Sequence, residues 1–143
     1  MLTPATVIEN YIRAKDRNRP ELIESAFDPA AVVRIEAQTD AISFPPALSG
    51  ATQIEQILVK EFALAWQEVR TFCFSHPGDA LRSDFSCCWM VAMRSRHGDG
   101  ARLGYGTYDW AFSGESGRVK TLKIRIDEMV VVEEPQAVVL INW

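Results

Sequence analysis

Apolar side chains recur at helical spacing near the start of the chain. Residues 4–16 place them on one stripe, formed by Val7, Ile8, Tyr11, Ile12 and Ala14. Thr3 is a good N-cap, and Pro4 suits the first helical position. We therefore predict a helix over residues 4–16, which is broken by the sequence Asn18-Arg19-Pro20.

Two further helices are predicted from the same kind of spacing. The second is short, and its apolar side consists of Leu22, Ile23, Ala26 and Phe27. It should end at Asp28-Pro29, because the residue before a proline avoids the α region. The third opens after Ser49-Gly50 and continues to about Trp66, with Ile54, Ile57, Leu58, Phe62 and Ala65 at helical spacing.

The remainder of the chain has the character of strands. Residues 31–37 are β-rich, and residues 41–44 form a possible second strand that Pro45-Pro46 stops. After Trp66 the predicted strands are residues 69–75, 84–94, 102–113 and 119–132, separated by turn signals. In the last strand Leu122, Ile124 and Ile126 alternate with charged residues, so even-numbered positions should face the core.

Helices followed by a strand meander predict an α+β fold, with three N-terminal helices packed on one face of a curved antiparallel sheet. A length of 143 residues suits a single domain, which we assign to residues 1–134. The tail, residues 135–143, is strongly apolar. A free apolar tail is an aggregation hazard, so it should pack either on its own domain or on a second subunit.

Composition narrows the classes of function. The net charge of −4 argues against a nucleic-acid partner, and no apolar run is long enough to span a membrane. The start of the chain lacks the pattern of a signal peptide, so we expect a cytoplasmic protein with reduced thiols. The adjacent Cys87 and Cys88 should point to opposite sheet faces, which argues against a bond between them.

Four segments in this order resemble the NTF2-like superfamily, also called SnoaL-like or cystatin-like α+β. They are Val7-Ile-Glu-Asn-Tyr-Ile-Arg-Ala, Ser25-Ala-Phe-Asp-Pro-Ala-Ala-Val-Val, Leu48-Ser-Gly-Ala-Thr-Gln-Ile, and Tyr108-Asp-Trp-Ala-Phe-Ser-Gly followed by Gly117-Arg-Val. The resemblance covers about residues 4–134. It implies a cone with a pocket between helices and sheet, and commonly a homodimer through the outer sheet face. Members include isomerases, cyclases, dehydratases, epoxide hydrolases and binding modules, so the fold alone does not settle the function.

The candidate catalytic residues are Tyr11, Glu36 and Asp109. Tyr11 matches the donor tyrosine of the ketosteroid isomerases within this superfamily. Where those enzymes place their acidic groups, this chain has Ile35 and Tyr108, and Glu36 and Asp109 each fall one residue away. Strand alternation then turns both carboxylates to the other face, unless a bulge corrects Glu36. Two departures from the pattern argue against isomerase activity.

Metal or cofactor chemistry has little support in the sequence. His76 and His97 both lie in turn signals, and neither has a partner at helical spacing. The glycines around residue 100 follow a hairpin and do not form a phosphate loop between a strand and a helix. We therefore expect neither a metal nor a cofactor.

Aromatic residues offer the clearest indication of a site. An apolar cavity could be lined by Tyr11, Phe44, Phe62, Trp66, Tyr108 and Trp110, the ligand-binding candidates. The leading hypothesis is a domain that binds a small hydrophobic molecule. The alternatives are a cofactor-free lyase or isomerase, with Tyr11 as donor and Glu36 or Asp109 as acid or base, and an interaction module that uses its outer sheet face. A cone filled completely by these side chains is the simplest competing interpretation.

Overall fold

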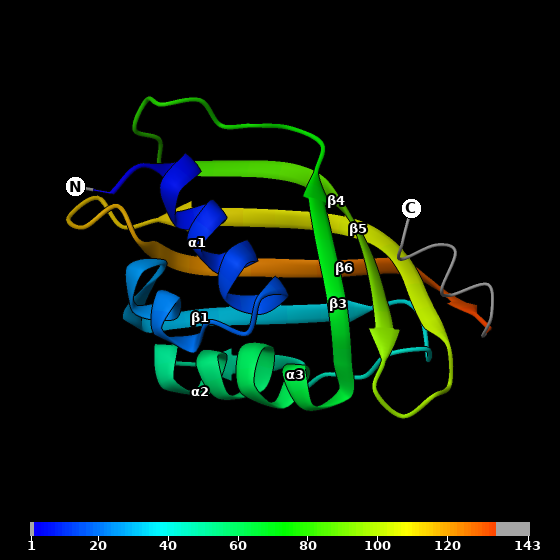
Figure 1. Cartoon of the computed structure of the whole chain (residues 1–143). Coiled ribbons are helices and arrows are strands. Elements are labelled where there is room, and N and C mark those ends of the chain that lie inside the picture. Colours follow the sequence, from blue (N-terminus) through cyan, green and yellow to red (C-terminus); the bar gives the residue numbers. More distant parts are fainter. Residues whose placement is uncertain (1, 134–143) are drawn as a thin grey trace.

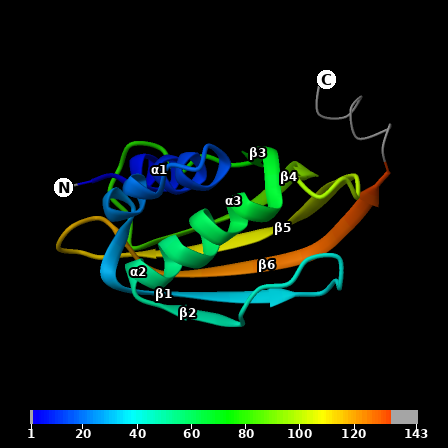
Figure 2. The ribbon, with the colours of Figure 1, turned by 60° about the horizontal axis from the view of Figure 1, so that its bottom comes forward.

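A computed structural model describes residues 2–133, and it shows helices gathered on one face of a single curved sheet (Figures 1 and 2). The helical elements are α1 (Pro4–Asp16), the 3₁₀ turn η1 (Pro20–Ser25), α2 (Ala51–Glu55), the π-helical turn η2 (Gln56–Glu61) and α3 (Phe62–Ala65). The strands are β1 (Phe27–Ala37), β2 (Ala47–Ser49), β3 (Trp66–Cys73), β4 (Asp84–Ser95), β5 (Ala101–Phe112) and β6 (Val119–Val132).

The first helix has the predicted bounds. Thr3 caps it, because the side-chain Oγ1 accepts a hydrogen bond from the backbone N–H of Thr6 at 3.3 Å. The last turn carries Arg13 and Lys15, whose charges suit the negative end of the helix dipole. The buried stripe includes Val7 and Tyr11 and extends to Lys15, one residue beyond Ala14, the last of the predicted apolar positions.

The second helix is shorter than predicted. It is a 3₁₀ turn that ends at Ser25, and the strand already begins at Phe27, so Asp28-Pro29 lies within β1. Pairing with β6 explains the difference, since the N–H of Val119 donates to the carbonyl of Ala26 at 2.8 Å. The third helix is confirmed as a continuous helical stretch from α2 to α3, and it begins after Gly50, whose φ is 89°.

The sheet has six strands in the order β2-β1-β6-β5-β4-β3. Strands β3 to β6 form the predicted antiparallel meander, while β1 runs parallel to β6. The α+β fold class is therefore confirmed, with one parallel pair in a mostly antiparallel sheet. The strand predicted at residues 41–44 was wrong. That segment is irregular and places Ile42 and Phe44 on the core, and Ala47–Ser49 pairs with β1 instead.

Alternation along the strands determines which side chains meet the helices. In β6 the even-numbered Leu122, Ile124 and Ile126 are buried, as predicted. The register of β5 against β6 shifts between Tyr105 and Gly106, and such a bulge increases the local bend and twist of a sheet. The concave face that results is the one under α1 and α3 (Figure 2).

The remaining structural expectations concern the thiols and the tail. Cys87 is buried and Cys88 is exposed, so the two side chains occupy opposite faces as predicted, and both are free thiols. Within residues 2–133 there is no helix long and apolar enough to cross a membrane. The tail at 135–143 lies outside the described residues, so its packing remains a prediction.

A candidate ligand cavity with a buried lysine

A cavity of about 50 Å³ lies between the helical layer and the concave sheet face. Its wall is almost entirely apolar and draws on α1, η2, α3, the segment before β2, and strands β1, β4, β5 and β6. The lining residues are Tyr11, Lys15, Ile35, Ile42, Phe44, Leu58, Phe62, Trp89, Val91, Met93, Tyr108, Ile124, Ile126 and Met129. The cone is thus not completely filled by its side chains.

Aromatic rings pack closely along the cavity wall. Tyr108 stacks on Trp89 with ring centroids 5.5 Å apart, and Tyr11 meets Tyr108 edge to face at 6.1 Å. Phe44 stacks on Phe62 at 6.4 Å on the side of the helices. Pairs of this geometry stabilise each other by about 0.5–1.5 kcal/mol beyond their buried area. Most of the wall is therefore held in a defined shape by its own contacts.

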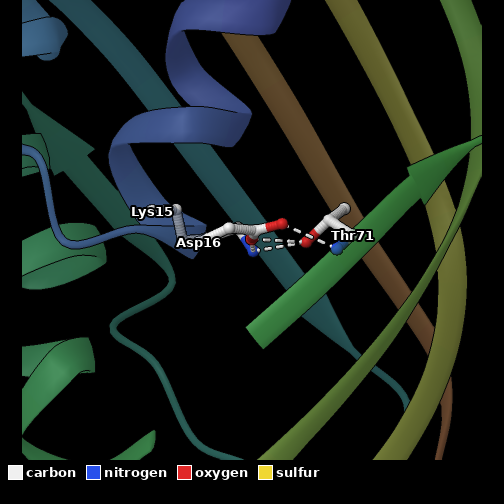
Figure 3. Close-up of polar contacts among 3 residues, drawn as sticks. All are labelled: Lys15, Asp16 and Thr71. Carbon is white, nitrogen blue, oxygen red and sulfur yellow. Dashed lines mark hydrogen bonds and ion pairs between the residues drawn. The ribbon is translucent and has the colours of Figure 1, made fainter. Parts of the chain in front are cut away.

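One polar cluster interrupts the apolar surroundings at the end of α1 (Figure 3). The Nζ of Lys15 donates to Asp16 Oδ1 at 2.9 Å and to Thr71 Oγ1 at 2.7 Å. Asp16 in turn accepts from the Thr71 N–H at 2.7 Å and from Thr71 Oγ1 at 2.8 Å. The side chains of Lys15 and Asp16 are only 9% and 12% exposed. This buried ion pair joins α1 to β3, and its lysine reaches the cavity wall.

Burial controls the ionisation of the two cavity tyrosines. Desolvation raises the pKa of Tyr11 above its ordinary value, and the nearby Asp16 carboxylate adds to this, while a hydrogen bond from Tyr108 opposes it. Desolvation also raises the pKa of Tyr108 well above its usual range, and the charge of an ionised Tyr11 would raise it further. Both hydroxyls are therefore neutral at physiological pH and act as hydrogen-bonding groups.

A pH dependence of stability follows from these two raised pKa values. A tyrosine has a pKa of about 10 in the unfolded chain, and here its pKa in the folded chain is higher. Its burial therefore stabilises the fold fully below pH 10, and this stabilisation is lost as the pH rises through the pKa of the folded state. We expect each tyrosine to contribute a loss of up to about 1.4 kcal/mol per pH unit above pH 10. Denaturation curves of wild type and Tyr11→Phe between pH 8 and about 11.5 test this. The variant should lose stability less steeply with pH, and identical slopes would contradict the assignment.

A pair of thiols lies close to the same cluster, on β3 and β4. A hydrogen bond from the Cys87 thiol lowers the pKa of Cys73, and the Lys15 charge acts in the same direction against the effect of burial. The same hydrogen bond, followed by burial, raises the pKa of Cys87. Neither thiol lines the cavity, so we assign them no part in ligand contact.

The structure separates the predicted ligand-binding residues into two groups. Tyr11, Phe44, Phe62 and Tyr108 line the cavity. Trp110 is buried beside them, with its ring 5.3 Å from Tyr108, but it does not reach the wall.

The last ligand-binding candidate, Trp66, also lies off the wall. It is half-buried at the start of β3 and packs under the Arg102 guanidinium at 5.1 Å. Trp66 therefore does not line the cavity.

The candidate carboxylates lie on the opposite face of the sheet from the cavity. Glu36 is exposed and pairs with Lys123 at 3.3 Å, while Asp109 is exposed and accepts a hydrogen bond from Ser86 at 2.6 Å. The pairing of β1 with β6 is regular from Val32 onward, so no bulge turns Glu36 inward. Of the three catalytic candidates, the structure places only Tyr11 at the cavity.

Sequence reasoning missed the polar cluster. Lys15 follows Tyr11 by one helical turn, so it lies on the buried stripe of α1, and this spacing was visible in the sequence. Its partner Thr71 is 56 residues away, and no local pattern connects the two. Trp89 also lines the cavity.

No protein-family model matches the sequence, and no curated protein matches it. Solved structures do match in three dimensions. An NTF2-like protein from Burkholderia thailandensis has a TM-score of 0.65 at 12% identity, with 100% of this chain and 99% of that chain covered. A computationally designed 17-OHP binder has a TM-score of 0.66 at 11% identity over 90% and 98% of the two chains.

A third similar structure is an epoxide hydrolase. The LEH-like epoxide hydrolase of Mycobacterium tuberculosis has a TM-score of 0.61 at 10% identity, covering 86% of this chain and 81% of that one. Identities at this level carry information about architecture and not about activity. The similar structures therefore differ in function while sharing one arrangement of helices and sheet. This protein has the NTF2-like fold.

Proposed function

We propose that the protein binds a small, largely apolar molecule in the cavity of its cone. The observation that carries the proposal is the apolar cavity itself, bounded by stacked aromatic rings and reached by one buried ammonium group. Sites of this composition bind ligands by apolar burial, and their few polar groups fix the ligand's orientation. The designed 17-OHP binder shares the fold, which supports small-molecule binding as a use of this architecture.

The size of the cavity limits what it accepts without rearrangement. A volume of about 50 Å³ is well below the roughly 300–1,000 Å³ of sites for drug-sized ligands. The ligand is therefore small, or part of the wall moves to admit it. Ile42 and Phe44 belong to the irregular segment before β2 and are only partly buried, so this segment is the part of the wall that we expect to move.

Blocking the cavity at this segment should abolish binding without disturbing the core. We expect Ile42→Trp to weaken binding of the apolar probe methylenecyclohexane at least about tenfold, because the larger ring occupies the space the probe needs. The matched control is Ser43→Trp, since Ser43 is exposed in the same segment and does not line the cavity. Chemical-shift titration by NMR measures both affinities. Equal binding by the two variants would contradict the proposal.

The wall composition favours binding over the lyase or isomerase alternative. Among residues 2–133 no carboxylate lines the cavity, and Asp16 is already held by Lys15 and Thr71. An acid or base for proton transfer must reach the substrate directly or through one water molecule. The ionisable side chains on the wall are those of Tyr11, Lys15 and Tyr108, and none of them is a carboxylate that could act as the base.

We also propose that the chain forms a homodimer through the outer sheet face, as the resemblance implies. That face carries large exposed apolar side chains, including Phe72 at 49% and Tyr105 at 54% exposure. Patches of this kind mark interaction surfaces, which also keeps the interaction-module alternative open. Light scattering at working concentration should give a molar mass twice that of one chain. The Tyr105→Lys variant should lower this mass toward that of a single chain. A monomer for the wild type would overturn this proposal.

A further inference from the structure

We propose that the cavity recognises a neutral oxygen acceptor, such as a ketone, ester or lactone carbonyl, carried by an otherwise apolar ligand. Two donors on the wall would bind it, the Lys15 ammonium and the Trp89 indole N–H. This inference rests on the proposed binding function and specifies the chemistry of its ligand. It concerns residues that neither the fold nor its catalytic patterns single out.

The first donor is an N–H of Lys15 that the polar cluster does not use. An ammonium group has three N–H donors, and Asp16 and Thr71 take one each. The Nζ also lies 5.2 Å from the centre of the Phe62 ring, which is itself part of the wall. The residue is 8% exposed, so water has little access to the third N–H. The side of the ammonium that meets the wall is thus available to a ligand.

The second donor is the indole N–H of Trp89. Its Nε1 is buried and has no hydrogen-bond partner among the described residues, although Trp89 lines the cavity. The ring stacks on Tyr108, and one of its carbons lies 2.9 Å from where a Cβ on Gly106 would stand. An unpaired buried N–H costs about 1–3 kcal/mol. Trp110 Nε1 is also buried without a partner but does not line the cavity, so Trp89 is the indole donor that a ligand oxygen in the cavity could satisfy.

The wall offers donors rather than acceptors. The Asp16 carboxylate accepts three hydrogen bonds from Lys15 and Thr71 and does not line the cavity. The hydroxyl oxygen of Tyr11 already accepts from Tyr108. A ligand that presents an N–H or O–H would meet side-chain acceptors on the described wall in the hydroxyl oxygens of the two tyrosines alone, whereas a carbonyl oxygen has lone pairs for both donors.

Charge balance favours a neutral acceptor over a carboxylate. Asp16 already neutralises Lys15, so an anionic ligand would bring an unpaired charge into an apolar space. The desolvation of such a charge is costly, while a carbonyl group adds no net charge. The proposal therefore excludes free acids as the preferred ligands.

Two probes of one shape test the inference. Cyclohexanone and methylenecyclohexane differ only by a carbonyl oxygen in place of a methylene group, and cyclohexanecarboxylate supplies the anion. NMR titration of the full chain should show cyclohexanone binding about tenfold more tightly than methylenecyclohexane, and the carboxylate more weakly than the ketone. The indole N–H resonance of Trp89 should move to lower field with cyclohexanone and not with the hydrocarbon.

Two variants identify the donors. Lys15→Met keeps the apolar stem, and Trp89→Phe keeps the aromatic ring on Tyr108 while removing the N–H. Each should reduce the preference for the ketone, taken as the ratio of the two probe affinities for the same variant, to below about threefold. The tryptophan variant also removes a donor without altering any charge, so it decides the question if the lysine variant does not fold.

The outcomes separate this inference from the proposed function. If both neutral probes bind the wild type equally, the donor assignment is wrong and the apolar binding function stands. Tighter binding of the carboxylate would also overturn it. If neither neutral probe binds, the proposed function fails, and the inference fails with it.

Discussion

Replacing Asp16 with alanine is expected to lower the free energy of unfolding by about 3–5 kcal/mol, because it leaves the Lys15 ammonium buried without its counter-ion. The Lys15 side chain is 9% exposed, and its Nζ now donates to Asp16 and to Thr71 Oγ1. The substitution would leave Thr71 Oγ1 as the remaining acceptor. The Thr71 N–H would lose its acceptor as well. Urea denaturation measures the difference.

The matched control is Asp127→Ala. Asp127 also forms a close ion pair, with Arg125 at 2.7 Å, but these side chains are 30% and 53% exposed. Exposed pairs contribute about 1 kcal/mol or less, because water screens them. Equal destabilisation by the two substitutions would show that the Lys15–Asp16 pair does not behave as a buried one.

Replacing Gly106 with alanine is expected to cost about 3 kcal/mol, the upper end for an overpacked core. A Cβ at this position would lie 1.8 Å from the carbonyl oxygen of Arg125 and 2.9 Å from a ring carbon of Trp89. The first of these atoms is backbone, so it cannot rotate away. Relief requires β5 and β6 to separate at the bulge where the sheet bends. The same change should therefore disturb the cavity wall at Trp89.

Gly114→Ala provides the control, because a Cβ there would meet nothing within 4 Å. It should leave stability unchanged or raise it slightly, since alanine restricts the unfolded chain. Thermal denaturation of both variants checks the comparison. If the Gly106 variant is as stable as the Gly114 variant, then β5 and β6 do not approach each other closely enough at Gly106 to exclude a Cβ.

Local patterns in the sequence were sufficient for the elements whose signals are local. Capping by Thr3 and the apolar stripe predicted α1 with its bounds, and alternation predicted both the bounds and the facing of β6. The prediction at residues 41–44 failed because their apolar character reflects contact with the cavity and not strand pairing. Asp28-Pro29 failed as a helix end because pairing with a distant strand took precedence over the local proline signal.

The candidate site was predictable only in part, for a similar reason. Alternation correctly turned Tyr108 toward the core and Asp109 away from it. It does not determine which inward side chains reach the cavity, which is why Trp110 was grouped with the wall. The role of Lys15 depends on Thr71, and these two residues meet only because α1 packs against β3 (Figure 3). A charged residue on an apolar stripe, one turn after Tyr11, is the feature of the sequence that indicates a buried polar cluster.

Xenon binding offers the sharpest experiment on whether the cone holds an apolar cavity that admits a ligand. Dry apolar cavities bind xenon, and the atom carries no chemistry of its own to bias the result. A crystal of the protein pressurised with xenon should show an atom bound between the aromatic wall and the sheet, near Phe62, Tyr108 and Ile124. A crystal with no xenon there, while xenon binds elsewhere on the chain, would contradict the claim.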